Sequence, residues 1–527
     1  MAGDGVPRRS LVLAGGGMRV AYQAGVIRAL FERGYGFAHV DGSSGGIMNT
    51  AMLLSGIEPV EMCRRWTTLD VKHFASFGPA RRFLRPLDLP ALGTADGIVE
   101  HVFPHLGIDV GRINRQRAVE GTFNLANFST KTVEPIPHEQ VTLEHLVAGV
   151  SLAIFLPAVE IEGQTYTDAV WIRDANLLEA VRRGADEIWV VWCIGNSPRW
   201  YDGAFHQYVH MIEMSANGGL FDQFDRIREL NDRIAAGDQP GGRTTPIRVH
   251  VIRPSRPIPL DPDFFLGRIT GETLVDMGYA DASQYLDAVP PAGTPLTPAA
   301  TATVANLPGI AFRETMRGWF AMGESDPVTG ARRGRAQNAA IALNASITVH
   351  DLERFIRDPE HPGSLAGNLD IAGFGTAIPA VRGVFNLFSP SNDAQTKLMV
   401  YEAGFRHGGS DYYFAGKKLV RHHFILKLWP DTTTLYVQLH EGKDASGPVI
   451  GAGVLHLNAF DLTKLMLGMH AIDTDAAHSS PEVTFEFLRF FLGELWATYI
   501  RRAMTRPDVA DRAPTAEAKT VRTPSAR

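Results

Sequence analysis

The sequence has few of the features that mark disulfide-stabilised, zinc-binding or nucleic-acid-binding proteins. Only two of its 527 residues are cysteines, Cys63 and Cys193. Both lie in apolar segments, which excludes a disulfide framework or a zinc-thiolate cluster and predicts two small core residues. The formal net charge is −6. No block of about five or more like charges is present, so the chain offers no basic field that would hold a nucleic acid.

The chain also lacks a long, uninterrupted apolar run. The longest extends from Leu146 to Val159 and is broken by Ser151 and Pro157, whereas a membrane-spanning helix needs roughly 20 apolar residues. Only four apolar residues lie between Ser10 and the first glycines, so we expect no secretory signal. The sequence predicts a cytoplasmic protein, with peripheral attachment to a membrane as the alternative location.

The pattern of the chain divides it into four parts. Residues 8–289 alternate short apolar strands with longer helical patterns, which predicts a three-layer α/β/α domain with a mainly parallel sheet. Residues 290–309 are rich in proline and small residues and predict a linker. Residues 310–504 alternate strand-like runs with glycine, aspartate and serine clusters, and predict a β-rich domain. Residues 505–527 have the composition of a disordered tail.

The last strongly periodic segment of the β-rich domain predicts a helix. Leu488, Phe491 and Leu495 recur at helical spacing on one side, with charged residues on the other. We expect this apolar side to dock on the core of the domain. A helix that lies on a membrane surface is the alternative.

Glycine is abundant, and two glycine clusters carry candidate chemistry. The second, Gly42-Ser43-Ser44-Gly45-Gly46, contains the Gly-x-Ser-x-Gly pattern between an apolar strand at Phe37–Val40 and a helical pattern from Ile47. A nucleophile elbow needs this strand-turn-helix setting, because a tight turn holds the serine in a strained conformation between small neighbours. Ser44 is therefore a candidate nucleophile. A glycine-rich turn with a capping serine is the alternative.

The first cluster, Gly15 to Gly17, follows a strand and precedes a helical pattern. Glycines at such a point expose backbone N–H groups that no Cβ atom obstructs, as an oxyanion requires. A nucleotide phosphate cradle is the competing interpretation. However, the segment lacks the third small residue of a dinucleotide fingerprint, and no Gly-Lys-Ser/Thr follows it.

The early position of Ser44 argues against a typical α/β-hydrolase. That fold places its serine after several strands and supplies an acid and then a histidine downstream. A carboxylate that acts directly on the serine is the other arrangement to seek. A Ser-His-Asp esterase stays open as an alternative, with His206, His210 and His250 as the histidines to test.

Residues 8–195 resemble the patatin-like phospholipases. "LAGGGMRVAYQAGVIRAL" is similar to the glycine-rich oxyanion loop of that family with its following basic residue, Arg19, and "DGSSGG" to its nucleophile elbow. The resemblance implies a Ser-Asp dyad without histidine, and "TDAVW" puts Asp168 at the dyad position. It also implies oxyanion donors at Gly15, Gly16, Gly17 and Gly45, substrate binding by Arg19, a lipid ester substrate, and neither cofactor nor metal.

One departure from the family pattern affects the dyad. The family has glycine after the aspartate, and this chain has Ala169. A left-handed backbone at this position would cost alanine roughly 1–2 kcal/mol and could displace the Asp168 carboxylate. A catalytically silent lipid-binding scaffold is therefore the second alternative. Asp174, the next carboxylate along the chain, is predicted to cap a helix.

The second domain resembles a different family. Segments such as "FRETMRGWF", "TKLMVYE" and "DTTTLYVQLHEG" are similar to the accessory domain of cholesterol-oxidase-like members of the glucose-methanol-choline oxidoreductases. The flavin fingerprint of those enzymes is absent from this sequence, so the resemblance implies no redox role. It implies a module that presents lipid or docks on a membrane. A domain that only stabilises the hydrolase or mediates assembly is the alternative.

Overall fold

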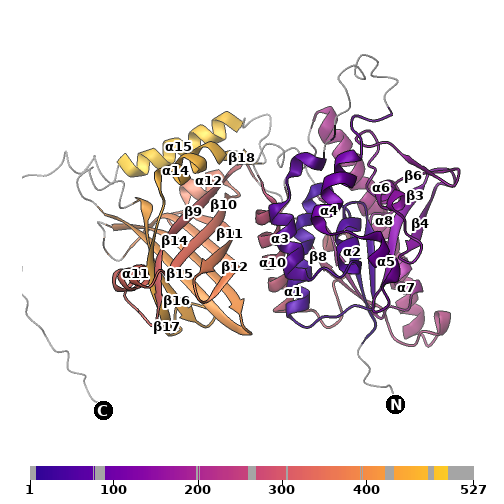
Figure 1. The fold of residues 1–527 in the computed structure, drawn as a ribbon, viewed down its shortest axis with the longest axis horizontal. Helices are drawn as coiled ribbons and strands as arrows, with labels where there is room; N and C mark the ends of the chain where they lie inside the picture. The colour runs from indigo at the N-terminus through magenta and orange to yellow at the C-terminus, as the bar shows by residue number, and fades with distance from the viewer. Residues whose placement is uncertain are drawn as a thin grey trace, which may run out of the picture.

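The chain forms two domains that lie side by side in the computed structural model (Figure 1). The structure describes residues 7–74, 76, 90–196, 200, 202–258, 269–303, 307–391, 393, 396–421, 432–472 and 480–496. The predicted tail at residues 505–527 lies outside these residues. Within them, every helix is too short or too polar to cross a bilayer.

A mainly parallel sheet forms the centre of the N-terminal domain. Its five parallel strands follow the order β3-β2-β1-β7-β8. They are β1 (Arg9–Leu13), β2 (His39–Ser43), β3 (Glu120–Asn127), β7 (Glu187–Val191) and β8 (Arg248–Ile252). Three antiparallel strands extend the sheet at the β3 edge, namely β4 (Thr132–Pro137), β5 (Val159–Ile161) and β6 (Gln164–Asp168).

Helices cover both faces of this sheet, as the near-continuous apolar strands predict. Residues of β1 and the alanine that follows it alternate between two cores: Leu11 and Leu13 pack on one side, and Val12 and Ala14 on the other. The first core takes in α1 (Ala21–Glu32), α2 (Gly46–Leu54), α3 (Pro59–Thr68), α4 (Phe103–Leu106), α5 (Val110–Arg115), α6 (Leu143–Gly149) and α10 (Gly271–Leu286). The second takes in α7 (Leu177–Arg182) and α8 (Ala204–Ala235). The predicted α/β/α fold is confirmed.

The segment predicted as a linker lies partly against this domain. The Thr294 N–H donates to the carbonyl of Val249 in β8 at 2.7 Å, and the Thr301 hydroxyl donates to the Asn217 side chain in α8 at 2.9 Å. Thr301 is fully buried. Thr294 and Thr301 thus hold residues 290–303 on the sheet and on α8, whereas the Leu307 N–H donates to the His350 carbonyl of the barrel and Gly309 already begins β9.

The C-terminal domain is a closed antiparallel sheet, in agreement with the β-rich prediction. Strand β9 (Gly309–Met322) pairs with both β10 and β17, so eight strands close into a barrel. The others in order are β10 (Ala340–Val349), β11 (Pro362–Ile371), β13 (Val381–Pro390), β14 (Thr396–His407), β15 (Ser410–Arg421), β16 (Thr434–Glu441) and β17 (Val449–His456). Two short strands, β12 (Gly375–Pro379) and β18 (His470–Ile472), pair with β11 and β9.

Side chains fill the inside of this barrel, and α15 (Ser480–Trp496) packs on its core. The helix buries Val483 and Phe487, and Phe487 lies with its ring centroid 6.1 Å from that of Phe312 in β9. The helix is therefore docked on the core as predicted, but its buried stripe begins at Val483 and Phe487, and Leu488 is only half-buried. Helices α11 (Pro327–Ala336), α12 (Leu352–Arg357) and α14 (Ala459–Gly468) complete the domain.

Helix α10 lies between the two domains and contacts both. On one side it packs so closely against α1 that a methyl group on Gly278 would lie 2.0 Å from the carbonyl oxygen of Tyr22. On the other side it faces the barrel, where Glu272 accepts hydrogen bonds from Arg313 at 2.9 Å and Asn368 at 2.8 Å. The helix is thus shared by both domains.

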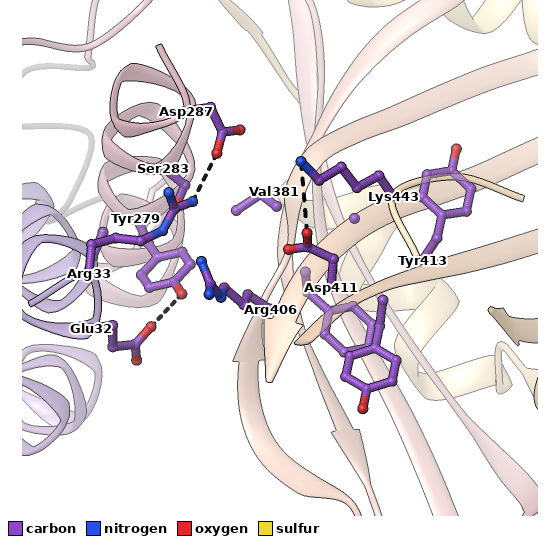
Figure 2. Close-up of a pocket in the computed structure, with 14 residues that line it drawn as sticks. Glu32, Arg33, Tyr279, Ser283, Asp287, Val381, Arg406, Asp411, Tyr413 and Lys443 are labelled. Atoms are coloured by element: carbon purple, nitrogen blue, oxygen red, sulfur yellow. Dashed lines mark hydrogen bonds and ion pairs between the residues drawn. The ribbon is translucent and has the colours of Figure 1, made fainter. Parts of the chain in front are cut away.

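A polar cleft lies beside this junction, between the end of α1, α10 and the barrel strands (Figure 2). Its charged side chains largely pair within the cleft. Arg33 binds Asp287 at 2.9 Å, and the Tyr279 hydroxyl donates to Glu32 at 2.5 Å. The residues that line the cleft include neither Ser44 nor Asp168, so it is separate from the candidate site.

Candidate active site

Ser44 lies in the tight turn between β2 and α2. Its φ angle is 50°, in the left-handed region that a residue other than glycine seldom adopts. Glycines surround it because side chains would collide: a methyl group on Gly45 would lie 2.7 Å from the Gly17 carbonyl oxygen, and one on Gly46 2.1 Å from that of Leu13. The sequence pattern therefore produces the strained serine that an elbow requires.

Asp168 is the last residue of β6, and the sheet brings it to Ser44. Strand β3 lies between β2 and β6, with Asn124 opposite Ser43 and Leu125 opposite Asp168. The Ser44 hydroxyl donates to Asp168 Oδ2 at 2.6 Å. The other carboxylate oxygen accepts the Val170 N–H at 2.9 Å.

Burial sets the proton affinity of this carboxylate. Asp168 is only 1 % exposed, and burial raises its pKa to about 6, although hydrogen bonds from Ser44 and Val170 act in the opposite direction. An ordinary aspartate near pKa 3.8 would be a weaker base. Asp168 is thus better suited to accept a proton near neutral pH than an exposed aspartate.

Ala169 does not have the backbone conformation that would displace Asp168. It is fully buried and begins a short helical turn, Ala169–Trp171, and it is not among the described residues with positive φ. Alanine therefore fits this position without left-handed strain, and the carboxylate next to it reaches Ser44.

The glycine loop that follows β1 lies against Ser44. Gly16 and Gly17 have φ angles of 153° and 59°, which favour glycine. A methyl group on Gly15 would lie 2.6 Å from Ser44 Cβ and 2.4 Å from Asp174 Oδ1. The loop can approach the serine this closely only because the side chain is missing.

The amides of the loop differ in their availability. The Gly15 N–H donates to Asp174 Oδ2 at 2.8 Å and is already paired. The N–H groups of Gly16, Gly17 and Gly45 make no hydrogen bond to another described residue. These three amides, and not that of Gly15, are available to a bound anion.

Side chains from α1, from α2 and from the short 3-10 helix Gly17–Val20 brace the loop, and the sequence did not point to two of them. Gln23 donates to the Ala14 carbonyl at 2.6 Å, and Asn49 donates to Gln23 Oε1 at 2.9 Å. Arg19, predicted to bind substrate, is 8 % exposed and donates from Nε to the Gly16 carbonyl at 3.0 Å. Gln23 and Asn49 could have been noticed as polar residues within apolar helical stretches.

The prediction that Asp174 caps a helix is wrong. Helix α7 begins at Leu177, and its cap is Asn176, whose side chain accepts the Glu179 N–H. Asp174 points away to the glycine loop and is 1 % exposed. The spacing Asn176-x-x-Glu179 in the sequence was the signal that favoured the later residue as the cap.

The three histidines of the alternative esterase mechanism lie elsewhere. His250 stacks on Trp189 with ring centroids 4.2 Å apart, and its Nδ1 pairs with the Tyr285 hydroxyl at 3.0 Å. His210 stacks on Trp200, and His206 lies next to Phe205. In the described residues, Ser44 has Asp168 as its side-chain hydrogen-bond partner and no histidine.

Comparison with known proteins gives a match within the N-terminal domain. The family described as patatin-like phospholipase matches residues 11–181, a range that contains the glycine loop, Ser44 and Asp168. No curated protein matches the chain. Residues 11–181 are therefore similar to the patatin-like phospholipases, in agreement with the resemblance that the sequence motifs carry. The match does not extend to the barrel, whose resemblance to an oxidoreductase accessory domain stays a prediction.

Proposed function

We propose that the N-terminal domain is a lipid acyl hydrolase in which Ser44 is the nucleophile and Asp168 its general base. The single observation that carries the proposal is the 2.6 Å hydrogen bond from the Ser44 hydroxyl to Asp168 Oδ2. The left-handed backbone of Ser44 and the family match at residues 11–181 support it. The substrate class is a lipid carboxylic ester.

The reaction follows from these positions. Ser44 Oγ attacks the ester carbonyl carbon while Asp168 takes its proton, and the carbonyl oxygen becomes an oxyanion that the amides of Gly16, Gly17 and Gly45 bind. Asp168 then gives the proton to the departing alkoxide, which leaves as an alcohol. Water attacks the acyl-enzyme, Asp168 accepts a proton from it, and the collapse of the second oxyanion returns the proton to Ser44.

Two residues predicted for this machinery have other contacts. Because the Gly15 amide is paired with Asp174, we assign Gly15 to the shape of the loop and not to the oxyanion. Arg19 binds the Gly16 carbonyl, which would hold the loop. A direct contact between Arg19 and substrate stays a prediction.

Labelling and hydrolysis together test the proposal. The wild type is expected to react with a fluorophosphonate at Ser44 and to hydrolyse members of a phospholipid and neutral-ester panel, whereas Ser44→Ala is expected to do neither. A wild type that stays unlabelled and inactive on every ester would instead favour the silent lipid-binding scaffold. Peptide mapping of the label identifies the modified residue.

Exposed apolar residues lie on segments of the N-terminal domain that contact one another, and they support a lipid surface as the place of reaction. We define an apolar collar by Leu92, Ile154, Phe155, Ile172, Phe205 and Met211, which are all exposed. Hydrogen bonds join its segments: the Leu92 N–H donates to the Ile154 carbonyl at 2.8 Å, and Tyr208 of α8 donates to the Ala153 carbonyl at 2.6 Å. An apolar rim of this kind is typical of membrane or lipid contact. We propose that the protein binds lipid surfaces peripherally; a cytoplasmic location stays a prediction.

Ile154 gives this collar a specific test. It is 57 % exposed and has a φ angle of 77°, a conformation that is unfavourable for a β-branched side chain. Ile154→Asn is expected to raise the free energy of unfolding by about 1 kcal/mol, because asparagine tolerates the left-handed region. The same change is expected to weaken binding to phospholipid vesicles and to leave hydrolysis of a monomeric short-chain ester unchanged.

A matched control separates the collar from general surface effects. Val328 is also β-branched and is 50 % exposed, on α11 of the barrel. Val328→Asn is expected to leave vesicle binding unchanged. Equal vesicle binding by the wild type and Ile154→Asn, measured by sedimentation in the Ser44→Ala background, would contradict the role of the collar.

A further inference from the structure

Asp174 is a buried carboxyl group beside Ser44 that the proposed reaction does not use. Its Oδ2 accepts the Gly15 N–H at 2.8 Å, and its Oδ1 is buried without a hydrogen-bond partner in the described part of the chain. The site that a methyl group on Gly15 would occupy lies 2.4 Å from this Oδ1 and 3.0 Å from Ser44 Oγ. Asp174 therefore faces the reacting serine across the glycine loop.

The surroundings of Asp174 disfavour a negative charge. Burial raises its pKa well above the ordinary value, and the nearby Asp168 raises it further, while the Gly15 N–H and the charge of Arg19 act in the opposite direction. Cys193 is the remaining titratable group next to it, and burial raises the pKa of this thiol to about 12, which keeps it neutral. The Arg19 guanidinium donates from Nε to the Gly16 carbonyl at 3.0 Å.

We propose that Asp174 is a positioning residue of the active site, whose buried carboxyl group accepts the Gly15 N–H and so holds the glycine loop against Ser44. The inference rests on the proposed function and adds a requirement to it. A second carboxylate here would oppose both the ionisation of Asp168 and the charge of the oxyanion. The loop therefore needs a hydrogen-bond acceptor at residue 174 that carries no charge.

Two substitutions at Asp174 separate the need for a hydrogen-bond acceptor from the need for a group that carries no charge. Asp174→Asn keeps an acceptor for the Gly15 N–H and cannot ionise, so its kcat is expected to stay within about threefold of the wild type near pH 7. Asp174→Ala removes the acceptor and is expected to lower kcat by about 10- to 100-fold with little change in KM, because the loop amides move. Equal losses in the two variants, or no loss in either, would overturn the proposal.

The pH profile gives a readout that a purely structural role would not change. The wild type is expected to lose activity at alkaline pH, when Asp174 ionises, whereas Asp174→Asn is expected to keep its activity there. Asp276→Asn is the matched control, because Asp276 is also a buried aspartate but lies on α10 and bonds to Asn368 of the barrel. It is expected to retain the alkaline loss. The same alkaline loss in Asp174→Asn would overturn the proposal.

Stability provides a test that does not depend on catalysis. A carboxyl group whose pKa is raised by folding contributes stability at low pH and loses it as the pH rises towards its folded pKa. The melting temperature of Asp174→Asn minus that of the wild type is therefore expected to increase between pH 5 and pH 9. A difference in melting temperature that stays constant over this pH range would show that Asp174 is charged throughout, and would overturn the proposal. An inactive wild type, by contrast, would count only against the proposed function.

Discussion

Replacing Asp168 by asparagine is expected to lower kcat for ester hydrolysis by about 10³- to 10⁴-fold, as for the loss of other dyad and triad members. Asparagine has nearly the same shape, so it can still accept a hydrogen bond from Ser44, which lies 2.6 Å away in the wild type. It cannot take the proton that Ser44 must lose. The substitution should therefore lower kcat and leave KM nearly unchanged. Steady-state assays with a soluble ester measure both constants.

Asp168→Asn is expected to lose activity without losing stability. Burial raises the pKa of Asp168 to about 6 in the folded protein, above its ordinary value of 3.8. The wild type therefore loses stability as the pH rises between these two values, because the carboxylate must ionise in a buried site. Asp168→Asn avoids this cost, and its melting temperature at pH 8 is expected to equal or exceed that of the wild type.

The same pKa determines how activity depends on pH. Asp168 accepts a proton only when it is ionised, so kcat/KM of the wild type should rise as the pH increases through about 6. The histidine variants His206→Ala, His210→Ala and His250→Ala serve as controls and should keep this profile. Loss of activity in one of them, with Asp168→Asn still active, would exclude the Ser-Asp dyad.

Gly46→Ala is expected to have the second-largest effect, on both stability and activity. The added methyl group would lie 2.1 Å from the Leu13 carbonyl oxygen and 2.7 Å from that of Ala14. Both contacts are to backbone, which cannot rotate away as a side chain can. The start of α2 and the end of β1 must separate, which should cost about 3 kcal/mol of unfolding free energy. The separation also moves the glycine loop away from Ser44, and kcat should fall by about 100-fold or more.

Gly218→Ala is the matched control for this substitution. Gly218 also lies in a helix, α8, but it is exposed and a methyl group there would meet no atom within 4 Å. Alanine should be neutral there or stabilise the helix by up to about 1 kcal/mol, because it has the higher helix propensity. Denaturant unfolding and ester hydrolysis, measured for both variants, check the pair. A Gly46→Ala protein as stable and active as Gly218→Ala would mean that the elbow and the loop are not in contact.

The sequence predicted the elements of the site that depend on local pattern. A turn rich in glycine between a strand and a helix leaves few conformations for Ser44, and the strained φ angle of this residue follows from the local chain. The alternation of apolar strands and helical segments similarly predicted the layered N-terminal fold. These features are local because backbone sterics and hydrophobic periodicity act over a few residues.

The role of Asp174 shows where local pattern fails. In the sequence, "RDANLLEAV" offers two capping residues within three positions, and propensity alone does not distinguish a cap from a carboxyl group that turns inward. Only the fold shows that Asn176 occupies the cap and that Asp174 meets the Gly15 amide, 159 residues away. The closure of the barrel likewise depends on tertiary structure. Strand β9 pairs with β17, which lies far from it along the chain, and the hydrophobic periodicity of each strand does not indicate its partner.

The sequence by itself thus indicated the candidate nucleophile and the loop, since their local patterns restrict the backbone, whereas the candidate base came only from the resemblance to the patatin-like phospholipases. Tertiary structure alone decided which of these groups meet, which amides stay available and which carboxyl group is enclosed. The physical reason is that hydrogen bonding, burial and the resulting pKa shifts depend on neighbours in space, and the sheet order supplies those neighbours from distant parts of the chain.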